Sequence, residues 1–80
     1  MYQWTSLAFP VCMVMHRRYV LRVDGLVWAY LNWDSGAQKW EVTVYKTYNP
    51  PLVFLTDEGT YRKPPKKMVE TLVAVIRGGL

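Results

Sequence analysis

Cysteine and histidine are scarce in this chain. Its 80 residues include a single cysteine, Cys12, and a single histidine, His16. One thiol cannot form an internal disulfide, and two such residues are too few for a structural zinc site, which usually takes four ligands. On an extended strand the two would lie roughly 13 Å apart, too far for a thiolate–imidazole pair. The sequence therefore predicts no metal site and no cysteine-based catalysis.

Other signals of catalysis, cofactors or membranes are also lacking. The glycines are isolated or terminal, so no glycine-rich phosphate loop is present, and Asp24, Asp34, Asp57 and Glu58 all fall at predicted turns. No apolar run approaches the roughly 20 residues of a membrane span. Residues 7–15 resemble a signal-peptide core, but no basic residue precedes them and Pro10 interrupts them. We expect a non-enzymatic protein without a cofactor, located in the cytoplasm, where a single free cysteine stays reduced.

What the chain has is apolar and aromatic content together with an excess of positive charge. Hydrophobic residues make up 51% of the sequence and aromatic residues 15%, which is ample for one packed domain over residues 1–80. Ten Lys and Arg against six Asp and Glu give a formal charge of +4. This excess permits an acidic partner without requiring one.

Residues 26–45 carry the clearest pattern. Apolar and polar residues alternate with a period of two on either side of a turn-compatible segment, residues 35–38, which predicts a β-hairpin. Placing Trp33 opposite Trp40 and Leu31 opposite Val42 makes one face continuously apolar. This register also sets Asp34 opposite Lys39, a favourable cross-strand contact. The opposite face then carries Trp28, Tyr30 and Tyr45 among polar residues.

The segments before this hairpin leave alternatives open. Residues 2–9 alternate as a first strand, and residues 11–15 form a continuous apolar run typical of a strand covered on both faces. Whether that run continues into residues 19–23 or turns at residues 16–18 is undecided. Asp24-Gly25 predicts a turn. A three-residue loop over residues 23–25 is favoured over a two-residue turn, because the latter would place Arg18 and Arg22 on the apolar face.

The segments after the hairpin predict a connection, a short strand and a helix. Residues 46–51 end in Pro50-Pro51, residues 52–56 read as a strand, and residues 57–59 form a turn. From residue 65 to 77 apolar residues recur at helical spacing, although the β-branched content of residues 69–76 leaves a strand as the alternative. The predicted fold is α+β: an antiparallel sheet of four to five strands, built as a meander of hairpins, packed with one C-terminal helix.

Two groups of residues are candidate partner-binding sites. The first is an arginine and aromatic face, and the second is a basic cluster at the strand-to-helix junction; together they comprise Arg18, Arg22, Trp28, Tyr30, Tyr45, Arg62, Lys63, Lys66 and Lys67. Arginine and aromatic side chains form hot spots for proteins and stacking platforms for single-stranded nucleic acid. The structural alternatives are that the helix or residues 2–9 cover the rings, and that the basic cluster is a solvated loop.

These features favour a small protein-binding module that acts by covering a partner's surface. Phage and mobile-element inhibitors of host nucleic-acid machinery, anti-CRISPR proteins among them, share this size and lack of motifs, and the likeness extends to no particular residue. In that case the partner is a nucleic-acid-processing complex, and the compartment is the host cytoplasm. The alternative is a single-stranded DNA or RNA binder, although the aromatic signature of the RNA-recognition sheet and zinc-knuckle spacing are both missing. The chain is expected to be a monomer or a homodimer.

Overall fold

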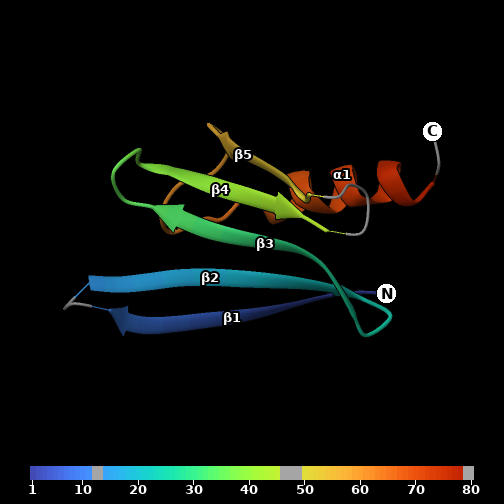
Figure 1. The fold of residues 1–80 in the computed structure, drawn as a ribbon, viewed down its shortest axis with the longest axis horizontal. Helices are drawn as coiled ribbons and strands as arrows, with labels where there is room; N and C mark the ends of the chain where they lie inside the picture. Colours follow the sequence, from blue (N-terminus) through green and yellow to red (C-terminus); the bar gives the residue numbers. More distant parts are fainter. Residues whose placement is uncertain (12–13, 46–49, 79–80) are drawn as a thin grey trace.

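Five antiparallel strands follow one another in chain order and form a single sheet, with one helix near the carboxyl end (Figure 1). This computed structural model describes residues 1–11, 14–45 and 50–78. The elements are β1 (Tyr2–Val11), β2 (Val14–Val23), β3 (Leu26–Asp34), β4 (Lys39–Val44), β5 (Leu52–Thr56) and α1 (Lys66–Arg77). The sheet order β1-β2-β3-β4-β5 is a meander. The predicted α+β fold with one C-terminal helix is therefore confirmed.

The hairpin of β3 and β4 has the predicted register. Trp33 pairs with Trp40 and Leu31 with Val42, and the other residue pairs of this hairpin also match the predicted register. Asp34 also lies opposite Lys39, but the expected contact between their charges is replaced by others. The Lys39 ammonium lies 2.9 Å from an Asp57 carboxylate oxygen, and Asp34 accepts a hydrogen bond from the Ala37 backbone N–H at 3.0 Å.

The turn between β2 and β3 differs from the favoured prediction. Val23 pairs with Leu26 around a two-residue turn, in which Asp24 and Gly25 have φ angles of 52° and 83°. The expected three-residue loop is therefore wrong. A register shift follows at once, because Leu21 pairs with Ala29 and leaves Trp28 as an extra residue on β3. This bulge returns the arginines of β2 to the polar face, which removes the objection to the two-residue turn.

The first hairpin of the sheet reverses within the apolar run of residues 11–15. β1 ends at Val11 and β2 begins at Val14, with these two residues paired, so a single strand over that run is wrong. β2 then continues without interruption to Val23, which excludes a turn at residues 16–18. The apolar run is explained by the two strand ends that meet there. Cys12 lies outside the described residues.

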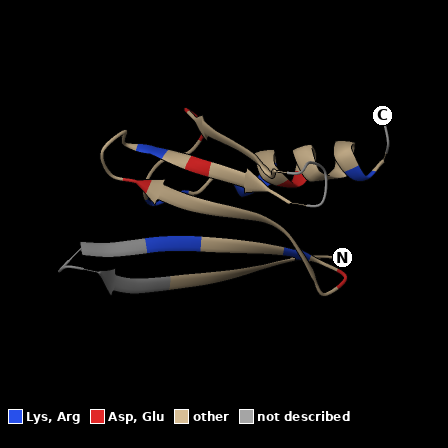
Figure 2. Cartoon of the chain, viewed as in Figure 1, with Lys and Arg blue, Asp and Glu red and all other residues tan. Residues whose placement is uncertain are grey.

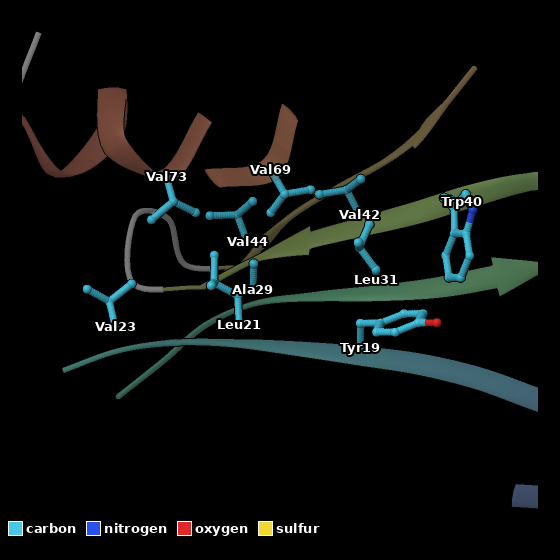
Figure 3. Packing of buried hydrophobic residues seen from close by; sticks show 10 residues of the cluster. All are labelled: Tyr19, Leu21, Val23, Ala29, Leu31, Trp40, Val42, Val44, Val69 and Val73. Atoms are coloured by element: carbon cyan, nitrogen blue, oxygen red, sulfur yellow. The ribbon is translucent and has the colours of Figure 1, made fainter. Parts of the chain in front are cut away.

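α1 packs on one face of the sheet and closes the core. Its apolar stripe repeats at helical spacing, and Val69 and Val73 are fully buried against strand residues that include Leu31, Val42 and Val44 (Figure 3). The helical interpretation of residues 69–76 is thus confirmed over the strand. We call the side of the sheet that carries α1 the helix face and the opposite side the outer face. No described element covers the outer face.

Gly25 in the β2–β3 turn and Gly59 in the loop before α1 have the same backbone conformation, and comparing them tests how tightly that loop is packed. Gly25 and Gly59 have φ angles of 83° and 81°, but a Cβ at Gly25 meets nothing within 4 Å, whereas one at Gly59 meets the Lys63 carbonyl oxygen at 2.7 Å. Gly25→Ala is expected to lower the free energy of unfolding by about 1 kcal/mol, the conformational cost alone. Gly59→Ala is expected to lower it by about 2–3 kcal/mol, because the steric clash is added. Urea unfolding measures both values, and equal losses would contradict this account.

A second test concerns Asp24, which joins the start of the chain to the end of α1. The Met1 ammonium donates a hydrogen bond to the Asp24 carboxylate at 2.8 Å, and the Arg77 guanidinium lies 3.8 Å from the other carboxylate oxygen. The pKa of Asp24 is therefore below its ordinary value of 3.8, mainly because of this hydrogen bond and then because of the charges of the ammonium and of Arg77. Because the folded-state pKa is lowered, the stabilisation is present above the unfolded pKa and is lost as pH falls through the folded one.

Asp24→Asn removes this titration and keeps a residue that tolerates positive φ in the turn. Between pH about 5 and pH about 2, the free energy of unfolding of the wild type is expected to fall more steeply than that of the variant. The carboxylate is exposed, so added salt is expected to reduce the difference. Parallel pH profiles at low salt would contradict the role of this ion pair.

Candidate functional site

Three rows of side chains make up the central part of the outer face. Paired residues in antiparallel strands point to the same side, so each row follows from the register. One row is Leu7, Arg18, Asn32, Glu41 and Leu55, and the next is Thr5, Val20, Tyr30, Thr43 and Val53. The third, beside the bulge, contains Gln3, Arg22 and Val27.

Arg18 is held in place at the centre of this face. Its Nε donates a hydrogen bond to the Asn32 side-chain oxygen at 2.7 Å, and its guanidinium lies 5.1 Å from the centre of the Tyr30 ring. Arg22, nearer the turn, donates from Nη1 to the Thr5 hydroxyl at 3.2 Å. Figure 2 colours the arginines of β2 blue, and on the outer face Arg18 and Arg22 lie in the first and third rows, with Val20 between them. Their positions are set before any partner arrives.

The tyrosines continue this arrangement across β3 and β4. Tyr30 and Tyr45 meet edge to face with ring centres 5.2 Å apart. Beneath the rings and guanidinium groups, Val20 is only 4% exposed and Thr43 only 9%, although no described element covers this face. The side chains of the face therefore pack against one another and form an ordered surface.

The flanks of the outer face are apolar and open. Leu7 on β1 is 50% exposed, and Val53 and Leu55 on β5 are 53% and 46% exposed. These residues lie in the same rows as Arg18 and Tyr30. The outer face thus combines a central arginine and tyrosine group with an aliphatic residue at each edge.

Trp28 does not belong to this surface, although the sequence placed it there. Its ring packs against the core on the helix face and lies 5.8 Å from the Arg77 guanidinium of α1. The cause is the bulge between β2 and β3, which shifts the alternation of β3 by one residue at this point. The structure therefore brings together Arg18, Tyr30 and Tyr45, with Arg22 close by, and separates Trp28 from them.

The basic cluster lies on the other side of the sheet and is divided in role. The Lys66 ammonium lies 4.8 Å from the Tyr19 ring centre and 5.9 Å from that of Trp4, so it covers the edge of the core. Lys67 is exposed, as are Arg62 and Lys63. The two predicted groups of site residues therefore do not form one surface.

A cluster around Arg17 was missed by the sequence analysis. Arg17 donates hydrogen bonds to the Tyr19 hydroxyl at 2.7 Å and to the Tyr61 carbonyl at 3.1 Å, and its guanidinium lies 5.0 Å from the Tyr61 ring centre. Nearby, Trp40 donates to the Thr60 carbonyl at 2.7 Å, and Trp33 packs edge to face on Tyr61. The cluster fastens residues 57–65 over Trp40. No sequence pattern links Arg17 to Tyr61, which is 44 residues away.

The described residues offer little for catalysis or metal binding. Across residues 1–11, 14–45 and 50–78, no three His, Cys, Asp or Glu side chains gather closely enough to hold a metal ion. A shallow hollow of about 260 Å³ lies at the end of the central hairpin, lined by Asn32, Trp33, Asp34, Ser35 and Glu41. Two carboxylates and the Ser35 hydroxyl line it, and no imidazole is among its lining residues. Cys12 and the side chain of His16 lie outside the described part.

Comparison of the chain with protein-family models, with curated proteins and with solved structures finds no match. Within the described residues, no helix is long and apolar enough to cross a membrane.

The division of the basic cluster generates a matched test. Lys66→Glu and Lys67→Glu change the net charge equally and occupy adjacent positions in the first turn of α1. Lys66→Glu replaces a cation over two rings with an anion, and is expected to lower the free energy of unfolding by about 1–2 kcal/mol. Lys67→Glu is expected to change it by less than about 0.5 kcal/mol. Thermal and urea unfolding measure both, and similar losses would show that Lys66 has no special structural role.

Proposed function

We propose that this protein is a non-enzymatic binding module whose outer face docks on another protein and blocks the surface it covers. The observation that carries the proposal is the preset group of Arg18, Tyr30 and Tyr45 on a sheet face that none of the described elements covers. Arginine and tyrosine are enriched among interface hot spots, where a few side chains supply most of the binding energy. The exposed aliphatic residues at both edges supply the apolar contact that surrounds such a centre.

Rigidity supports the same proposal. Hydrogen bonds and ring contacts already hold Arg18 and Tyr30, so binding requires little further loss of side-chain freedom. Five strands spaced about 4.8 Å apart and three rows about 6.8 Å apart give a projected area on the order of 500 Å². That is a large part of the roughly 800 Å² per partner in a standard interface. An ordered face of this size suits a protein surface.

The arrangement supports a protein partner more than a single nucleic-acid strand. A stacking platform needs ring faces that bases can reach, but the Tyr30 ring lies beneath Arg18 and meets Tyr45. Trp28, the largest ring of the predicted platform, lies on the helix face. Arg18 and Arg22 share the outer face with Glu41, so its charge is modest. The partner that fits is a protein with an apolar surface and carboxylates placed to meet two arginines.

Blocking a surface is a sufficient mechanism for an inhibitor of this size. The chain carries no recognised catalytic set in its described residues, and its activity would come from occupying a site that another molecule needs. A nucleic-acid-processing complex of a host cell is the partner class we propose, since small phage and mobile-element inhibitors of that machinery share this size and lack of motifs. This part of the proposal rests on likeness in size and style alone.

Val53→Glu and Val75→Glu test the assignment of the face. Both valines are about half exposed, at 53% and 44%, but Val53 lies on the outer face and Val75 on α1. With a partner identified by quantitative affinity capture from a host lysate and then purified, Val53→Glu is expected to weaken binding at least about tenfold, because it buries a charge at the interface. Val75→Glu is expected to bind like the wild type. Isothermal titration calorimetry measures both.

Arg18→Ala extends the test to the centre of the face, with an expected loss of about thirtyfold or more in affinity. Loss of binding by Val75→Glu with retention by Val53→Glu would overturn the assignment. A parallel titration with labelled single-stranded and double-stranded oligonucleotides tests the alternative function. Submicromolar, steeply salt-dependent binding to an oligonucleotide, abolished by Arg18→Ala, would replace the proposed function with a nucleic-acid-binding one.

A further inference from the structure

The free edge of β1 has no charged residue. β1 spans ten residues, Tyr2–Val11, lies at one end of the sheet order, and contains no Lys, Arg, Asp or Glu. Its pairing with β2 is continuous, without a bulge that would twist the edge away. Monomeric proteins usually protect an edge strand by charge, proline, bulges or short length, because its free backbone groups otherwise pair with another strand. Pro10 is the only such device within β1, and it lies near one end.

The opposite edge of the sheet shows the contrast. β5 has only five residues, Leu52–Thr56, and is preceded by Pro50 and Pro51 and followed by Asp57 and Glu58. Short length, proline and charge are the usual means of blocking edge pairing. The same sheet therefore has one protected edge and one that is open for pairing.

The backbone groups that face the free edge can be identified. The Asp24 N–H donates to the Met1 carbonyl, so Met1 directs its backbone groups toward β2. Because these directions alternate along a strand, the even-numbered residues of β1 direct theirs outward. They are Tyr2, Trp4, Ser6, Ala8 and Pro10. Proline is tolerated at residue 10 for the same reason, since the N–H that it lacks would face away from β2.

We propose that this edge of β1 pairs with the same edge of a second copy of the chain, antiparallel about a two-fold axis near Thr5. Trp4 then lies opposite Ser6 of the second copy, and Tyr2 opposite Ala8, which gives about eight backbone hydrogen bonds. Each of these two aromatic residues meets a small one, and the two Thr5 residues form a favourable pair at the axis. A shift of two residues toward the carboxyl end would instead bring Pro10, which has no N–H to donate, opposite Tyr2.

The dimer joins two five-stranded sheets into one of ten strands. Even-numbered residues pair with even-numbered residues, so both helices lie on one side and the two outer faces become continuous on the other. The pairing rests on the β1 edge and does not depend on the proposed function of the outer face. About seven paired residues per chain give an interface below the roughly 1,200 Å² of standard complexes, in the size range of weak and transient contacts, so we expect dissociation in the micromolar range.

Sedimentation equilibrium of the full chain from about 5 to about 500 µM tests the proposal, because a micromolar dimer dissociates within this range. The wild type is expected to shift from monomer to dimer. Ser6→Pro removes an outward N–H and leaves the bonds to β2 intact, so it is expected to stay monomeric at all these concentrations. Ser6→Ala keeps the N–H and is expected to dimerise within about threefold of the wild type. Circular dichroism confirms that each variant is folded.

Amide hydrogen exchange on the wild type gives a second measurement that needs no variant. The amides of Trp4, Ser6 and Ala8 are expected to exchange at least about tenfold more slowly at high than at low concentration, whereas those of Thr5 and Leu7, bonded to β2, are protected throughout. A wild type that stays monomeric at about 500 µM, a folded Ser6→Pro variant that dimerises like the wild type, or outward amides whose exchange ignores concentration would each overturn the proposal.

Discussion

The register of the β3–β4 hairpin is the constraint on which the rest of the structure depends. Leu31 opposite Val42 and Trp33 opposite Trp40 define one apolar side, and a slip of one residue would turn that side toward solvent. The pairing of the other strands with these two decides which of their side chains are on the apolar side, and α1 packs against that side. The same pairing assigns Tyr30 and its polar neighbours to the opposite side. The position of the core and of the candidate binding surface is therefore decided by one hairpin.

A single helix of 12 residues covers only one side of a five-stranded sheet. On the helix face, residues beyond the reach of α1 are covered by the loop over Trp40, fastened through Arg17 and Tyr61. On the outer face the side chains cover one another, and the packing of Arg18 and Tyr30 leaves Val20 almost inaccessible. The outcome is an ordered surface that no element in the described part of the chain covers, which is the physical basis of the binding function proposed for it.

The two edges of the sheet are treated differently, and this asymmetry bears on assembly. Two prolines precede β5 and two carboxylates follow it, whereas β1 consists of ten uncharged residues that pair continuously with β2. A meander necessarily leaves its first and last strands at the edges, so the question of what meets the edge of β1 arises from topology. In the proposed dimer the β1 edge of a second copy pairs with it, and the outer faces of the two copies become continuous. Edge and face would then contribute to one larger binding surface.

The sequence by itself determined the fold class and the central register and favoured the C-terminal helix, because alternation with a period of two or of 3.6 is a local property that burial enforces. It also determined that Tyr30 and Tyr45 share a face, whereas Arg18 joins them through a two-residue turn and a bulge that only the structure shows. Only the tertiary structure decided the position of Trp28, since a one-residue bulge leaves no mark in the alternation and yet reverses a side chain. The tertiary structure also decided the role of Lys66. In the sequence it belongs to a basic cluster, but in the structure its ammonium lies over the rings of Tyr19 and of Trp4 on the first strand. Contacts between distant segments depend on packing geometry, which a local pattern does not encode.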